Sequence, residues 1–287
     1  MSPNRRRLAL VVAMGALLVL AGCGGGNGAP TDGSDAPNVN DSAVASEAVA
    51  SIESVDSYRV DGNVTMVISA NAMTQERTSQ VRGAFDRANR ELRLNQTITA
   101  RGRSITVATY LVGETIYQHN PQYVQRFGAS WIKRGVGDNF TRRWRLLDTM
   151  TRQRAILQNA SVEVTAETTV DGTAAYVLEA DVDQADFQNL TGALGAAAGD
   201  ATVRDARFTY YLAKDSGRLL RSVGHVNTTA TVRGRTIQQN VTFRLRFSGY
   251  GESIDITLPD AASTAVNISE EIGGSGSESS ARIAPRP

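Results

Sequence analysis

The feature that most constrains the fold is an alternation of apolar and polar residues that begins at Tyr58 and recurs along the chain. In its clearest run, Val241, Phe243, Leu245 and Phe247 alternate with polar residues. Successive side chains of a strand point to opposite faces, so this period indicates half-buried strands. The sequence therefore predicts one antiparallel, meandering sheet of about ten or eleven strands. The alternating runs are residues 58–68, 81–85, 92–98, 105–112, 115–118, 162–170, 176–182, 206–212, 219–226, 237–247 and 254–258.

Three segments depart from the alternation and favour helices. In residues 41–55, apolar positions recur three to four apart behind a cap at Asp41 or Ser42. Residues 140–157 and 184–198 show the same spacing. Long strands with one apolar face need a cover. We therefore expect an α+β fold, mainly antiparallel β, in which a half-barrel wraps around the N-terminal helix and two inserted helices.

If the helices fill such a half-barrel imperfectly, a cavity remains, and its lining comes from the same residues that would otherwise form a core. The sequence does not separate these two uses. The candidate lining residues are Tyr58, Val60, Val64, Met66, Phe85, Leu92, Leu94, Tyr110, Tyr117, Phe208, Tyr210, Phe243 and Phe247. The candidate lid or plug residues are Trp144, Leu147, Met150, Phe187, Leu190 and Leu194.

The N-terminus has the pattern of an export signal that ends in a lipidation site. Three arginines precede an apolar run at residues 8–20, and Leu-Ala-Gly-Cys at residues 20–23 forms a lipobox. The run is shorter than the roughly 20 residues of a spanning helix. Cleavage before Cys23, the single cysteine, and its lipidation would anchor the protein to the extracytoplasmic face of the membrane. A plain signal peptide is the alternative, and the paired arginines also admit twin-arginine export.

These features divide the chain into four parts. We expect a signal peptide at residues 1–22 and a flexible linker from the lipidated Cys23 to residue 40, rich in Gly, Pro and Asp. A folded half-barrel domain covers residues 41–262. Residues 263–287 form a disordered tail.

Charge and composition exclude several classes of partner. With 30 basic and 29 acidic side chains, the net charge of +1 favours neither nucleic acid nor an electrostatic membrane dock. A lipidated Cys23 leaves no cysteine for a disulfide, so the core alone must hold the fold.

Nine asparagines head an Asn-x-Ser/Thr sequon. Asn-x-Thr suits the polar face of Thr-rich strands, but sequons on an exported protein also predict glycosylation. A lipobox together with sequons would fit an archaeon. Asn40 and Asn267 lie outside the predicted domain, and the candidate glycosylation sites within it are Asn63, Asn95, Asn139, Asn159, Asn189, Asn227 and Asn240.

The residues do not assemble into a catalytic pattern. His119 and His225 lie on different predicted strands, without the spacing of metal ligands. No Gly-x-Ser-x-Gly elbow marks a nucleophile. We expect neither enzyme activity nor a cofactor or metal.

Five arginines fall on the first inserted helix. They form either a solvated face or a set that meets anionic lipid headgroups. These residues are Arg142, Arg143, Arg145, Arg152 and Arg154.

Several stretches resemble the LolA/LolB and LppX/LprG group of periplasmic and lipoprotein carriers. They are residues 50–66 (ASIESVDSYRVDGNVTM), the Gly, Tyr and Trp of residues 112–133, residues 170–178, the hairpin at 211–220 and the closing FSGYGESIDITLP at 247–259. The resemblance implies an incomplete barrel around a helix, whose apolar cavity in characterised members holds lipid or acyl chains. LolA is a soluble shuttle, whereas this chain carries its own anchor, so the lipid-anchored branch is the closer analogue.

We therefore expect a membrane-anchored lipoprotein that binds a hydrophobic ligand or a lipidated partner without chemistry. The alternative is a structural or protein-interaction module of the cell envelope with a filled core.

Overall fold

The structure is a computed structural model that describes residues 37–70, 73–193, 201–232 and 234–269. The predicted signal peptide, Cys23 and most of the linker lie outside these ranges and remain predictions.

The described residues form one 12-stranded sheet in the order β12-β6-β5-β4-β3-β2-β1-β11-β10-β9-β8-β7. Each strand pairs antiparallel with its neighbours except β12, which runs parallel to β6. The pairing of β1 with β11 joins the N-terminal and C-terminal halves. The strands are β1 (Ser57–Ala70), β2 (Met73–Asp86), β3 (Glu91–Ala100), β4 (Arg103–Val112), β5 (Thr115–His119), β6 (Trp131–Gly135), β7 (Ser161–Val170), β8 (Thr173–Asp181), β9 (Thr202–Ala213), β10 (Leu219–Val232), β11 (Arg235–Ser248) and β12 (Val266–Asn267).

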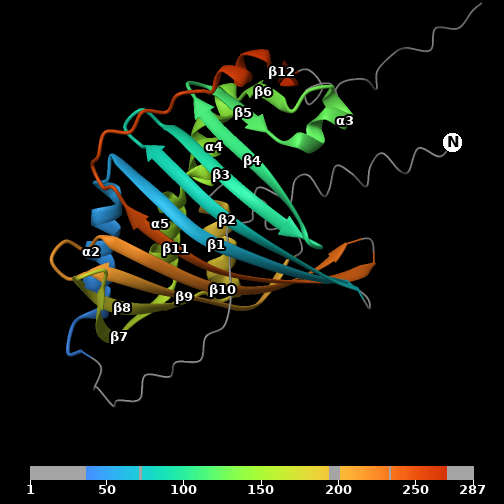
Figure 1. Ribbon diagram of the computed structural model, residues 1–287. Coiled ribbons are helices and arrows are strands. Elements are labelled where there is room, and N and C mark those ends of the chain that lie inside the picture. Colours follow the sequence, from blue (N-terminus) through green and yellow to red (C-terminus); the bar gives the residue numbers. More distant parts are fainter. Residues whose placement is uncertain (1–36, 71–72, 194–200, 233, 270–287) are drawn as a thin grey trace, which may run out of the picture.

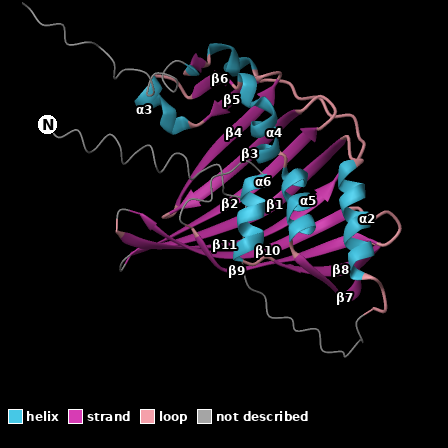
Figure 2. Ribbon diagram, turned by 180° about the vertical axis from the view of Figure 1, so that it is seen from behind, coloured by secondary structure: helices cyan, strands magenta, loops and turns pink. Residues whose placement is uncertain are grey.

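The helices lie on one face of this curved sheet (Figures 1 and 2). They are α2 (Asp41–Glu53), α4 (Phe140–Leu147), α5 (Thr149–Asn159) and α6 (Gln184–Ala193). The short η3 (Pro121–Tyr123) and α3 (Val124–Phe127) follow β5, and two further turns are η4 (Gly137–Asn139) and η5 (Asp260–Thr264). The predicted α+β half-barrel, an open antiparallel sheet wrapped on helices, is confirmed. We call the face that the helices cover the inner face and the opposite one the outer face.

Several element boundaries differ from the prediction. The N-terminal helix is capped by Asn40, whose side chain accepts a hydrogen bond from the Ala43 amide, rather than by Asp41 or Ser42. The predicted helix at residues 140–157 is two helices, because Asp148 has extended backbone and caps α5.

The C-terminal part of the domain also differs. Residues 254–258 do not form a strand. They cross the outer face, where Ile256 packs with Tyr110 and Trp131. The fold then continues past the predicted boundary at residue 262, since β12 pairs with β6 and Ile268 is buried.

The core divides into two clusters because the sheet is covered on both faces. The larger cluster fills the space between the inner face and the helices, and the smaller one lies under the C-terminal segment on the outer face. Two glycines on the inner face, Gly83 and Gly224, make room for rings in the larger cluster. At Gly224, a Cβ atom would lie 2.4 Å from the Phe243 ring and 2.7 Å from the Phe208 ring.

This close packing gives a first test. We expect Gly224→Ala to lower the free energy of unfolding by about 1 to 3 kcal/mol, because the two rings must shift to admit a methyl group. Urea denaturation measures the change. Gly135→Ala is the matched control, since a Cβ there meets nothing within 4 Å. Equal stability of the two variants would contradict the packing.

Candidate functional site

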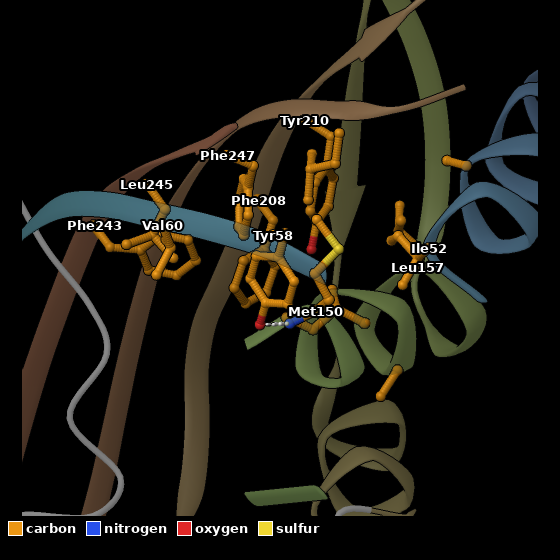
Figure 3. Packing of buried hydrophobic residues seen from close by; sticks show 14 of the residues in the cluster. Ile52, Tyr58, Val60, Met150, Leu157, Phe208, Tyr210, Phe243, Leu245 and Phe247 are labelled. Carbon is orange, nitrogen blue, oxygen red and sulfur yellow. Dashed lines mark hydrogen bonds between the residues drawn. The ribbon is translucent and has the colours of Figure 1, made fainter. Parts of the chain in front are cut away.

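Eleven of the predicted lining residues lie together on the inner face, in the larger cluster (Figure 3). Their positions follow from register, since Tyr58 opposes Phe85 and Phe85 opposes Leu92 across the paired strands. Tyr58, Phe85 and Leu92 are 0% exposed, so they serve as core. The eleven residues are Tyr58, Val60, Val64, Met66, Phe85, Leu92, Leu94, Phe208, Tyr210, Phe243 and Phe247.

The rings of this cluster touch one another. Tyr58 and Phe85 stack with centroids 4.6 Å apart and planes 1° from parallel. Phe208 and Phe243 lie 5.8 Å apart. Offset aromatic pairs at such distances add to the stability that burial provides.

The predicted plug residues close the same cluster from the helix side. Trp144 and Leu147 on α4, Met150 on α5 and Leu190 on α6 are buried in it, and Phe187 packs against it. Leu194 lies outside the described residues.

Tyr110 and Tyr117 do not join the other lining residues. They oppose each other across β4 and β5 and point to the outer face, where Tyr110 lies 6.0 Å from Trp131. Alternation alone does not show this, because β4 is buried on both faces from Ala108 to Leu111. On β4 and β5 the residues that point to the inner face are Leu111 and Ile116, which oppose each other and lie in the larger cluster.

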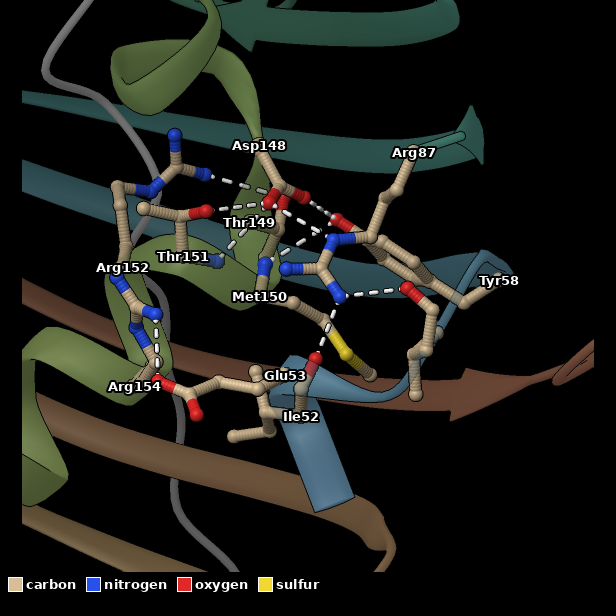
Figure 4. A network of polar contacts seen from close by, with 11 residues as sticks. Ile52, Glu53, Tyr58, Arg87, Asp148, Thr149, Met150, Thr151, Arg152 and Arg154 are labelled. Atoms are coloured by element: carbon tan, nitrogen blue, oxygen red, sulfur yellow. Dashed lines mark hydrogen bonds and ion pairs between the residues drawn. The ribbon is translucent and has the colours of Figure 1, made fainter. Parts of the chain in front are cut away.

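A buried polar network joins the helices to the inner face (Figure 4). Its centre is Asp148, 0% exposed, between α4 and α5. Tyr58 donates to the carboxylate at 2.6 Å, and Arg87 forms an ion pair with it at 3.2 Å. Arg87 also donates to the Ile52 and Val55 carbonyls near the end of α2.

Burial perturbs the groups of this network. Desolvation first, and then the charge of Asp148, raise the pKa of Tyr58 well above its ordinary value of 10.0. Burial lowers the pKa of Arg152, which donates to the Leu146 carbonyl and to Thr149 Oγ1. The hydrogen bonds of Asp148, Arg87 and Arg152 join α2, α4, α5 and β1, so the network holds these helices in place on the sheet.

Further along the strands, the inner face becomes half-exposed and carries both apolar and polar side chains, with Gln96 of β3 directly opposite Val107 of β4. Ser79 on β2 opposes Val64 on β1 and, on its other side, Ile98 on β3. Ile98 in turn opposes Ile105 on β4. Val107 follows Ile105 on the same face of β4 and is half-exposed like both isoleucines. We call Ile98, Ile105 and Val107 the apolar strip. Ile68, Val226 and Ile237, on the inner face of β1, β10 and β11, are also half-exposed, at rows of the sheet beyond that of Val64.

The predicted glycosylation sites lie on two surfaces. Register places Asn63, Asn95, Asn227 and Asn240 on the outer face, with Asn227 directly opposite Asn240. Among the others, Asn139 and Asn189 are exposed near the helices, and the side chain of Asn159 donates to the Ala155 carbonyl. Their glycosylation remains a prediction.

The five arginines of the first inserted segment do not form one face. Arg142 and Arg145 are exposed, Arg143 is half-exposed, Arg154 pairs with Glu53 at 2.8 Å, and Arg152 points into the polar network. The helix break at Asp148 separates the two groups.

Both histidines are on the outer face. His119 stacks on Trp131 at 5.1 Å, and His225 lies 3.6 Å from Asp205. Within the described ranges, no three His, Cys, Asp or Glu side chains are grouped as metal ligands. No described helix is long and apolar enough to cross a membrane.

The sequence matches no family model and no curated protein. Among solved structures, the lipoprotein LppX of Mycobacterium tuberculosis has 14% identity and a TM-score of 0.39, with 76% of this chain and 100% of that chain covered. LprF of Mycobacterium bovis has 13% identity and a TM-score of 0.42, with 78% and 99% covered. LppX is one of the proteins that give their names to the group resembled by the sequence motifs.

Sequence reasoning missed the polar network. Asp148 lies inside what looks like a single helical run, with Thr151 three residues later. An aspartate within an apolar-periodic run is also an N-cap signal, because its side chain accepts from the amide three positions on. That signal identifies the break between α4 and α5. It does not identify Tyr58 and Arg87 as the partners of Asp148.

Two buried tyrosines, one with a hydrogen-bonded hydroxyl and one without, test the network. Tyr58→Phe removes a hydroxyl that donates to Asp148 and accepts from the Met150 amide at 3.1 Å. We expect unfolding to become easier by about 1 to 3 kcal/mol. Tyr210→Phe is the matched control, because its buried hydroxyl has no hydrogen-bond partner among the described residues. Urea denaturation should show that this variant is as stable as the parent or up to about 1 kcal/mol more stable. Equal losses in both variants would contradict the network.

Alkaline pH should destabilise the fold. Burial raises the pKa of Tyr58, Tyr210 and Tyr250 in the folded state. The unfolded chain releases these protons near the ordinary tyrosine pKa of about 10, whereas the folded chain keeps them. Their contribution to stability is therefore fully present below about pH 10 and is lost as the pH rises further. Urea midpoints between about pH 8 and 11 should fall, less steeply in Tyr210→Phe than in the parent. Parallel curves for the two proteins would contradict this assignment.

Proposed function

We propose that this protein is a lipid-anchored extracytoplasmic lipoprotein that holds a hydrophobic ligand against the uncovered part of its inner sheet face. The observation that carries the proposal is the half-exposed apolar strip of Ile98, Ile105 and Val107, which continues the buried core outward. Apolar side chains left partly exposed beside polar ones such as Gln96 are a feature of surfaces that bind apolar ligands.

The helix-covered part of the inner face serves as core in this proposal. Tyr58, Phe85 and Leu92 pack against one another and against Met150, so a ligand there would have to displace a filled interior. On the strip it needs only to displace water. Covering half-exposed valine and isoleucine side chains stabilises a complex by about 1 kcal/mol each, since full burial contributes about 1.5 to 3 kcal/mol.

The proposed anchor limits what such a protein can do with its ligand. The proposed linker at residues 24–40 would have a typical end-to-end distance of about 20 to 25 Å. The domain would take up or present a ligand close to its own membrane. The proposed binding requires no chemical step.

The filled interior also supports a second candidate function, a protein-interaction module of the cell envelope. In that case an apolar segment of a partner protein covers the strip, and no lipid is bound.

A matched pair of variants tests the ligand proposal. Val107→Ser removes methyl groups from the apolar strip, and Val67→Ser makes the same change at a half-exposed valine on the outer face. Titration with Nile red, a neutral apolar dye, should give a fluorescence gain in the parent. We expect the dye to bind Val107→Ser about fivefold more weakly, because about 1 kcal/mol of apolar transfer energy is lost, and Val67→Ser like the parent.

Native mass spectrometry of protein purified from membranes provides the complementary measurement. Lipid adducts in the parent that diminish in Val107→Ser support carriage. A lipid-free mass together with no gain in dye fluorescence would rule out the carrier and leave the interaction module.

A further inference from the structure

A cluster of arginines lies at the end of the inner face formed by β5 and β6. Arg134 on β6 opposes Ile116 on β5, so both side chains point inward. Arg143 on α4 is close enough for its charge to act on Arg134, and Tyr123 from η3 is close enough to interact electrostatically with Arg134 and with Arg126. Figure 2 shows α3, α4, β5 and β6 gathered at this end. We call Arg134, Arg143 and Tyr123 the cationic cluster.

This cluster is short of negative charge. Among the described residues, neither Arg134 nor Arg143 forms an ion pair, although most of the exposed arginines on the outer face of β1, β2 and β9 do. The Nε atom of Arg134 is buried and has no acceptor in the described structure. Burial and then the like charge of Arg143 lower the pKa of Arg134. A cation held beside another cation without an acceptor is costly, and an anion between the two would relieve both penalties.

The cationic cluster borders the apolar strip. The Tyr123 hydroxyl lies 3.5 Å from Gln118 Oε1, and Gln118 Nε2 lies 3.5 Å from Thr109 Oγ1. Thr109, Val107 and Ile105 are successive inner positions of β4. Alternate residues of a strand are about 7 Å apart, so the polar end passes directly into the strip.

We propose that Arg134 and Arg143 bind a phosphate or carboxylate group, and that this anion is the head of an amphiphile whose chain lies along Val107 and Ile105. The inference rests on the proposed function for the chain and adds the class of head group. A guanidinium suits this role because its fork of donors matches the two oxygens of either anion. The Tyr123 hydroxyl donates to Gln118 Oε1 at 3.5 Å, so the two guanidinium groups are the donors assigned to the anion.

The test compares probes that share a tail and differ in charge. Decyl phosphate, 1-decanol and inorganic phosphate are titrated against the Nile red complex of the parent protein. We expect decyl phosphate to displace the dye at a concentration at least about tenfold lower than decanol, the effect of one charge-assisted hydrogen bond or more. Inorganic phosphate should not displace it.

Variants locate the head group. Arg134→Gln should reduce the advantage of decyl phosphate over decanol to about twofold or less, and Arg143→Gln should reduce it severalfold. Arg103→Gln is the control, because Arg103 is an exposed arginine at the far end of the same inner face of β4. It should keep the full advantage. Arg143 is half-exposed, so its variant gives an answer even if Arg134→Gln fails to fold.

Each result separates this inference from the proposed function. If neither decyl probe displaces the dye, the hydrophobic site itself is wrong. If decanol and decyl phosphate bind equally well, the hydrophobic site stands and the head-group site is overturned. Inorganic phosphate that matches decyl phosphate in direct calorimetric titration would make the cluster a site for free anions and overturn the amphiphile. Loss of the advantage in Arg103→Gln alone would overturn the assignment to Arg134 and Arg143.

Discussion

The arrangement of helices on the sheet depends on the carboxylate of Asp148. It ends α4, caps α5, accepts a hydrogen bond from Tyr58 on β1 and pairs with Arg87, which itself holds the end of α2. Three helices and the sheet therefore meet at one buried charge. A buried pair contributes little net stability, but loss of one partner costs about 3 to 5 kcal/mol, so such a pair specifies one arrangement. The position of the helices then decides which part of the inner face stays covered.

That division of the inner face is the basis of the functional argument. Where α2, α4, α5 and α6 cover the sheet, the side chains that could have lined a cavity have become core. Beyond the helices the same alternation continues, and Ile98, Ile105 and Val107 are left half-exposed. Without a disulfide among the described residues, the fold takes its stability from its two core clusters. In the proposed function, the half-exposed part of the inner face contributes binding energy instead.

The two-residue alternation of apolar and polar side chains, together with the turn residues, was enough to predict the sheet. The alternation within a strand can be recognised without knowing which strands lie beside it. They could not assign the faces of a strand buried on both sides. Tyr110 and Leu111 are equally apolar, and only the pairing with β3 and β5 shows that Leu111 points inward. Residues 254–258 alternate like a strand, yet they cover the outer face without joining the ladder. Tyr58 and Arg87 lie far from Asp148 in the sequence, so the spacing of residues along the chain could not identify them as its partners.

The cationic cluster gives the apolar strip a direction. A uniformly apolar surface would accept a chain in either orientation, whereas the partly buried Arg134 and Arg143 would favour an anion at their end over the exposed Arg103 at the other end, with the hydrocarbon along β4. A ligand held in this way has its charged group beside η3 and α4 and its tail on the sheet. In the proposed carrier, which would exchange amphiphiles with its own membrane, a fixed orientation of the ligand would decide whether the head group or the hydrocarbon chain leaves the bilayer first. The arginines would then bear on the order of transfer as well as on affinity.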